Sequence, residues 1–175
     1  MQEPSAYQDA IAFKYPEAVV VVIAKDEGGR YNPITLGWSM VSSSTPPMLA
    51  VAINARAHSV DAIRHSRAFV LAFPAAAQAQ EALFFGTHSG RDTAKLAATG
   101  TPTQPAVAID GLLLSEAVAN FECVLEGEAP SGDHIIFIGR VVACHRNADP
   151  GLGRLYSLGQ GGLGSAQPGE VFARR

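Results

Sequence analysis

Short apolar runs rich in β-branched residues recur along this chain, and residues that favour turns separate them. The first run, from Ala18 to Lys25, reads AVVVVIAK, and its shortness and β-branched content predict a strand buried on both faces. Further strands are predicted at Ile34 to Val41, Met48 to Asn54, Ala68 to Phe73, Ala119 to Glu128 and His134 to His145, with a weaker one at Ala106 to Leu114. Many strands with few, short helices predict a mainly β fold, a closed or nearly closed barrel with helices at its ends.

Turn residues and helix signals complete this outline. The turn Asp26 to Arg30 joins the first two strands into a hairpin, and Ser42 to Pro47 is expected to be a loop because proline lacks the donor for a β-ladder. A helix is predicted at Ser59 to Ser66, with Ser59 as its N-cap. We also expect short helices at 78–85 and 93–99, a connection at 127–133, and an irregular chain from Asp149 that includes the glycine-rich loop 159–164.

Chain length and charge limit the classes of function that this sequence can have. The 175 residues predict a single domain over 1–175 with its core at about 12–165, since 47% are hydrophobic and 17% charged. A net charge of −3 without a basic block disfavours nucleic acid and anionic membranes as partners. The two cysteines, Cys123 and Cys144, lie far apart, and the histidines lack ligand spacing, so no metal site is predicted. Without a signal-like or membrane-spanning segment, the expected location is cytoplasmic.

The segment from Phe85 to Lys95 combines glycines, hydroxyl residues and two cations after an apolar stretch. Backbone N–H groups, the Ser89 hydroxyl, Gly90 and the Lys95 ammonium are the donors that hold a phosphate. The alternative is an ordinary surface turn, because Ser89 and Asp92 also fit a capping box.

Four other segments carry polar groups near expected strand ends. Arg56, His58 and Ser59 precede a helix N-terminus, which favours an anion, although Asp61 already complements that helix dipole. Asn32 to Trp38 offers donors beside apolar surface, as a flat heteroaromatic ring requires; a plain hairpin turn is the alternative. Ser42 to Ser44 can cap a ligand or be a common loop, and His134 at a strand mouth can act on a ligand or be structural.

The order of these segments resembles the flavin reductase-like FMN-binding split barrels, and among them the flavoredoxin type. The resemblance covers roughly residues 12 to 165. The matching pieces are Val19 to Ala24, Gly28, Asn32-x-x-Thr35-x-x-Trp38, Val41-Ser42-x-x-x-Pro46-Pro47, Ser59, Phe69, Pro74, Gly86-x-x-Ser89-Gly90-Arg91-Asp92-x-x-Lys95-x-x-x-x-Gly100, Glu116, Glu122-Cys123, Gly132-Asp133-His134-x-x-x-x-Gly139-x-Val141 and Leu155-Tyr156-x-Leu158-Gly159.

This resemblance implies a split β-barrel of Greek-key type with short flanking helices, and a homodimer that binds FMN near its interface, with FAD as the alternative flavin. Asn32, Pro33, Ile34 and Thr35, with Ser42, Ser43 and Ser44, are then expected at the flavin ring. Arg56, His58, Ser59, Ser89, Gly90 and Lys95 are expected near the phosphate, and His134 where a nicotinamide approaches the ring.

Some positions depart from the family's pattern. Ala94 stands where the family often has an aspartate, which leaves Lys95 without that carboxylate as an orienting partner. Phe85 stands where a cysteine is common, and Ala57 where an arginine is common, with Arg56 and His58 beside it. The hypothesis is that Arg56 or Lys95 neutralises the phosphate.

The resemblance implies an oxidoreductase that moves hydride from NAD(P)H, a transient donor, to flavin and then passes electrons to an acceptor. Because the cofactor performs the difficult step, no acid–base dyad is needed among the side chains. A non-catalytic flavin-binding or electron-carrier module on the same fold is the alternative, since fold does not settle activity. A barrel that has lost flavin and serves in dimeric assembly is a third interpretation.

Overall fold

The computed structural model describes residues 1–159 and 162–166, and its centre is a curled antiparallel sheet of seven strands in the order β3-β2-β6-β9-β10-β5-β4. The strands are β2 (Val20–Lys25), β3 (Tyr31–Leu36), β4 (Ser39–Ser44), β5 (Pro47–Asn54), β6 (Ala68–Phe73), β9 (Ala119–Ser131) and β10 (His134–Arg146). The consecutive strands β5 and β6 lie on opposite sides of the β9–β10 hairpin, the crossover of a Greek-key barrel. The predicted mainly β, split-barrel fold class is confirmed.

The prediction of a first strand buried on both faces is also confirmed. Val20, Val22 and Ala24 of β2 face the barrel interior, and the alternate residues Val21 and Ile23 face a second cluster on the outer side. Helices α3 (Ala79–Thr87) and α4 (Lys95–Thr99) and the small β7–β8 sheet (Thr103–Pro105, Leu112–Leu114) cover that outer side. Both faces of β2 are therefore apolar, and α3 and α4 cover its outer face.

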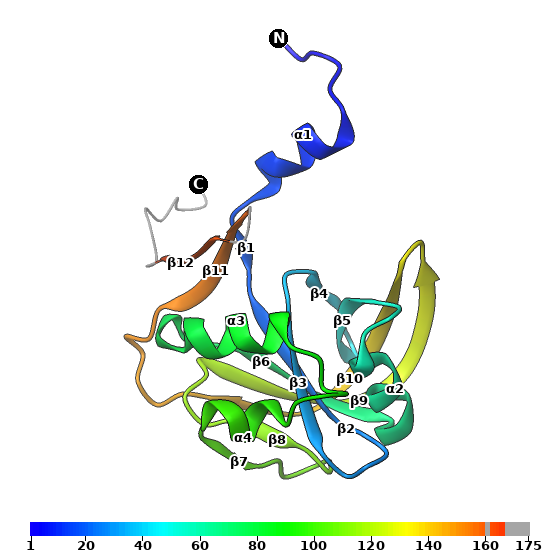
Figure 1. The fold of residues 1–175 in the computed structure, drawn as a ribbon, viewed down its shortest axis with the longest axis vertical. Coiled ribbons are helices and arrows are strands. Elements are labelled where there is room, and N and C mark those ends of the chain that lie inside the picture. The colour runs from blue at the N-terminus through cyan, green and yellow to red at the C-terminus, as the bar shows by residue number, and fades with distance from the viewer. Residues whose placement is uncertain (160–161, 167–175) are drawn as a thin grey trace.

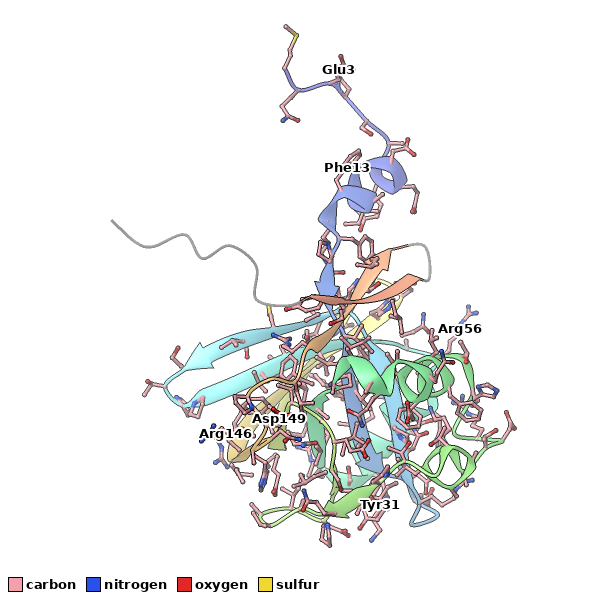
Figure 2. The ribbon with its side chains drawn as sticks, turned by 90° about the vertical axis from the view of Figure 1, so that its left-hand side faces the viewer. Glu3, Phe13, Tyr31, Arg56, Arg146 and Asp149 are labelled. Carbon is pink, nitrogen blue, oxygen red and sulfur yellow. The ribbon has the colours of Figure 1, made fainter. Side chains whose placement is uncertain are left out.

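The remaining elements flank the barrel. Helix α2 (His58–Ser66) joins β5 to β6 and packs on the interior cluster through Val60 and Ile63. The 3₁₀ turn Ala76–Gln78 leads into α3, and β1 (Glu17–Ala18) pairs with the β11–β12 hairpin (Arg154–Gly159, Gly162–Ala166). The N-terminal helix α1 (Tyr7–Ile11) and the 3₁₀ turn Ala12–Lys14 project from the body (Figures 1 and 2). Within the described ranges, no helix is long and apolar enough to span a bilayer.

Two segments expected as turn and loop are strands. Asn32 to Thr35 lies inside β3, where Asn32 pairs with Ala24 across the ladder. Ser42 to Ser44 lies inside β4, an edge strand paired with β5. The prediction of a loop at Ser42 to Pro47 was wrong because the turn consists of Thr45 and Pro46 alone. Pro47 is the first residue of β5, a position that tolerates proline.

Other boundaries were also wrong. The connection expected at 127–133 shrinks to Gly132 and Asp133, with Gly132 at φ +61°, since β9 continues to Ser131 and β10 begins at His134. The chain after Asp149 forms the β11–β12 hairpin instead of an irregular coil, and residues 160–161 of the expected loop 159–164 lie outside the described residues. In the weak region at 106–114, only Leu112–Leu114 is a strand, and the predicted helix 93–99 begins at Lys95.

Candidate functional site

A cavity of about 350 Å³ lies where β3 begins, β5 ends, α2 begins and α3 leads into the segment before α4. Its lining brings together eight of the predicted site residues: Asn32, Ile34, Arg56, His58, Ser59, Ser89, Gly90 and Lys95. Asn54, Ala57, Phe85, Gly86, Thr87, His88 and Arg91 complete the wall. Segments separated by up to about sixty residues thus converge on one polar hollow.

Lys95 is the most deeply placed cation of this cavity. Its side chain is 3% exposed, and its Nζ donates a 3.0 Å hydrogen bond to the carbonyl oxygen of Phe85. Burial lowers the pKa of Lys95 to about 8, because a desolvated ammonium is disfavoured unless an anion compensates it. A phosphate in the cavity would supply that compensation.

Asp26 contacts the side chains of Arg30 and His58 beside the cavity. Its carboxylate lies 3.1 Å from His58 Nε2 and 3.3 Å from Arg30 Nη2, and Arg30 also donates to the carbonyl of Gly90 at 3.0 Å. Burial alone would raise the pKa of Asp26, but the hydrogen bonds from His58 and the Arg30 backbone N–H outweigh it and lower that pKa. The ionised Asp26 therefore holds the turn after β2 against the Gly90 segment.

Asn32 and Gly90 fit together at the cavity floor. Asn32 Nδ2 donates to Ser59 Oγ at 2.8 Å, while Asn32 Oδ1 is buried and has no hydrogen-bond partner within residues 1–159 and 162–166. A Cβ on Gly90 would overlap the Asn32 amide and lie 2.9 Å from the His58 ring. Only glycine leaves room for this close approach, which covers the Asn32 side-chain oxygen.

The predicted cap at Ser59 is wrong. Helix α2 begins at His58, so its N-cap is Ala57, which has no side chain that could cap it. The Ser59 hydroxyl lies inside the helix and accepts from Asn32. The Ser89–Asp92 capping box is absent too, since α4 begins beyond it with Ala94 as N-cap. Ser89 Oγ instead accepts from the Arg91 N–H at 3.2 Å. This hydrogen bond stabilises a turn within the loop before α4.

The charges of the cavity do not cancel. Asp26 pairs with Arg30 and His58, and the exposed Arg91 pairs with Asp61 at 3.6 Å. Among the described residues, neither Arg56 nor Lys95 makes an ion pair. At pH 7 two cations are therefore left for a ligand, which matches a dianionic phosphate.

Six predicted site residues do not line this cavity. Ser42, Ser43 and Ser44 lie on the edge strand β4. Pro33 is buried in β3, and Thr35 Oγ1 donates to the Ala82 carbonyl at 2.6 Å, which ties β3 to α3. His134 begins β10 directly beside Asn54, so it adjoins the cavity across one ladder step.

A second cavity, of about 310 Å³, is lined by residues of β5 and β10 together with Trp38. The His134 ring packs on Trp38 at 4.6 Å with a 40° tilt, and His134 Nδ1 lies 2.7 Å from Asp133 Oδ1. Ala50, Ala52 and Ile136 line the second cavity together with Trp38 and Met40.

The β5 pattern explains this row of small residues. Asn54, Ala52 and Ala50 share one face because side chains alternate along a strand, while Leu49, Val51 and Ile53 fill the interior. Sequence reasoning missed the outward row, although the strict alternation of large and small residues in this strand was a signal for it.

Comparison with known proteins identifies the family. Residues 12–160 match the flavin reductase like domain model, and the chain belongs to this family of split-barrel proteins. It is similar to an FMN-binding protein from Thermus thermophilus solved with bound p-hydroxybenzaldehyde, with 27% identity, a TM-score of 0.86, and coverage of 99% of this chain and 100% of that chain.

Curated relatives have similar identities. An uncharacterized protein of Pyrococcus abyssi is 29% identical over 129 residues, which is 74% of this chain and 73% of that protein. An NADH-dependent FMN reductase, AsuE2, of Streptomyces nodosus subsp. asukaensis is 29% identical over 129 residues, which is 72% of this chain and 67% of that protein. The FMN-binding protein and the FMN reductase are both named for flavin.

Proposed function

We propose that the protein binds FMN and transfers hydride from NAD(P)H to it, passing electrons on to an acceptor. The observation that carries this proposal is a cavity with two unpaired cations that adjoins an apolar row along β5 and β10. A ligand with a doubly charged tail and a flat apolar head suits that pair of surfaces. The relative named an NADH-dependent FMN reductase supports the same assignment.

The phosphate end is assigned to Lys95, Arg56 and the hydroxyls of Ser59 and Ser89. Lys95 gains most from an anion because its ammonium is desolvated, and Arg56 is exposed at the mouth, where it can close over the ligand. Two cations balance one phosphate monoester dianion, which favours FMN over FAD.

The ring end is assigned to the surface at Asn54, which lines the first cavity with Ile34 and pairs with His134 across the sheet. The small side chains of Ala50 and Ala52 leave room against the sheet. Bound flavin would supply the two-electron chemistry at this surface. His134, held by Asp133 and packed on Trp38, orients a donor ring and shields one side from water.

The proposal includes a homodimer. Trp38, Met40 and Val41 of the β4 region are 46%, 59% and 72% exposed, and together with the second cavity they form an apolar face on an edge strand. Such a face favours burial against another copy. As the sequence predicts, we place this chemistry in the cytoplasm.

The test is a fluorescence titration with FMN followed by an NADH oxidation assay. We expect the double variant Arg56→Ala/Lys95→Ala to bind FMN at least 100-fold more weakly, and Arg146→Ala, an exposed arginine on β10 remote from the cavity (Figure 2), to bind it normally. Unchanged affinity in the double variant removes the phosphate assignment. Tight FMN binding without NADH oxidation makes the chain a flavin-binding module, and tighter binding of FAD overturns the choice of FMN.

A further inference from the structure

A third cavity, of about 240 Å³, lies at the other end of the barrel from the phosphate-binding cavity. Its wall includes Leu49, Leu71 and Phe73 with Ser39, Met40 and Arg154. It shares no lining residue with the first cavity, whereas Ser39 and Met40 also line the second. Leu49 lies near the start of β5, whereas Asn54, the last residue of β5, lines the first cavity. The two cavities are thus separate sites.

Arg154 is an unusual residue for this apolar setting. Its guanidinium lies 4.4 Å from the ring centre of Phe73 and 5.5 Å from that of Tyr156. Among the residues that the structure describes, its buried Nε has no hydrogen-bond partner and no carboxylate forms an ion pair with it. A guanidinium with a buried donor and no counter-ion lacks the acceptors that such a group normally finds.

We propose that this third cavity binds a small carboxylate carrying an aromatic or branched apolar group. Stacking on Phe73 fixes the plane of the Arg154 guanidinium, which prepares it for a planar carboxylate. The walls of Leu49, Leu71 and Met40 take up the apolar part, and the Ser39 hydroxyl is the second polar group at the cavity. An inorganic anion has no apolar part that could contact these walls.

Benzoate is the probe, measured by isothermal titration calorimetry on the unmodified protein. We expect saturable binding of benzoate and at least tenfold weaker binding of benzyl alcohol. No saturable benzoate binding, or equal binding of the alcohol, overturns the proposal. This comparison needs no variant, so it remains decisive if a substitution prevents folding.

Three variants locate the site. Arg154→Gln is expected to weaken benzoate binding at least tenfold while FMN affinity stays within twofold, and Arg146→Gln on the exposed end of β10 is the matched control. Ala18→Leu keeps the guanidinium but fills part of the cavity, so it should also reduce benzoate binding at least tenfold. Normal benzoate binding by a folded Arg154→Gln protein would mean that Arg154 serves only to stack on Phe73, and would refute the site.

Discussion

Replacing Lys95 with methionine should stabilise the protein without ligand while it weakens flavin binding. The ammonium of Lys95 is buried and has one neutral acceptor, the Phe85 carbonyl. Methionine has a similar length and carries no charge, so the substitution removes the cost of burying an ion. It also leaves the Phe85 carbonyl without this donor, which offsets part of the gain.

The magnitude follows from the pKa. A decrease from 10.5 to about 8 corresponds to about 3 kcal/mol at roughly 1.4 kcal/mol per pKa unit. The ammonium lines an open cavity, so solvent reduces the penalty, and the lost hydrogen bond costs about 1 kcal/mol. We expect a net gain of about 1 kcal/mol in the free energy of unfolding at pH 7, and FMN binding weakened by about 10- to 100-fold, the value of one charge-assisted contact.

The pH dependence has a defined sign. Between pH 8 and 10.5 the unfolded chain still holds the Lys95 proton that the folded protein has released, so wild-type stability from this group rises with pH across that window. The Lys95→Met variant lacks this rise. Because FMN favours the charged lysine, FMN affinity of the wild type should fall as the pH passes above 8.

Urea unfolding at pH 7 and pH 10, with FMN titrations at both values, measures each quantity. Lys25→Met is the matched control, because Lys25 pairs with Asp110 away from the cavity. An exposed ion pair contributes little to stability, so this variant should unfold like the wild type and retain its FMN affinity. The prediction is wrong if Lys95→Met is less stable than wild type at pH 7 with the same pH slope, or if it binds FMN as well as wild type.

Three further substitutions test the packing around the sites. Gly90→Ala should weaken FMN binding at least tenfold, because the new methyl group displaces Asn32; wild-type affinity in a titration would contradict this fit. Gly139→Ala should destabilise the barrel by about 2 kcal/mol in urea unfolding, since its Cβ would lie 2.5 Å from the Phe69 ring. Glu122→Gln should cost about 3 kcal/mol at pH 7, because burial raises the pKa of Glu122 but the N–H groups that bond its carboxylate outweigh it and lower that pKa. The stability from Glu122 should disappear as the pH falls below 4.5, and a difference that persists undiminished at pH 3 would be inconsistent with this account.

The elements that sequence reasoning located well are those whose signal is local. Ala68–Phe73 was predicted with its observed bounds, and Met48 to Asn54 differs from β5 by one residue, because a short apolar run between turns specifies a buried strand by itself. The β4 strand at Ser42 to Ser44 was missed because its pairing comes from β5, and a polar edge strand carries no apolar signature.

Sequence reasoning located the site residues in segments that carry several hydrogen-bond donors. It missed the contacts that join residues of distant segments. Ser59 was assigned to a helix cap, which is the local interpretation of a serine before a helix. Its actual partner, Asn32, lies 27 residues earlier in strand β3. No pattern near Ser59 indicates that contact. The same holds for Asp26, whose pairing with His58 requires the barrel to bring β2 beside α2.

Ala94 shows how a departure from the family's pattern becomes intelligible in the structure. The missing aspartate leaves Lys95 without a carboxylate to orient it, yet Lys95 is the first residue of α4, and its ammonium reaches the Phe85 carbonyl at the end of α3. A carbonyl orients the ammonium as a carboxylate would, but does not neutralise it. Lys95 therefore keeps a full, poorly solvated charge for its ligand, and the affinity that an aspartate would have weakened is retained at the expense of stability in the unliganded protein.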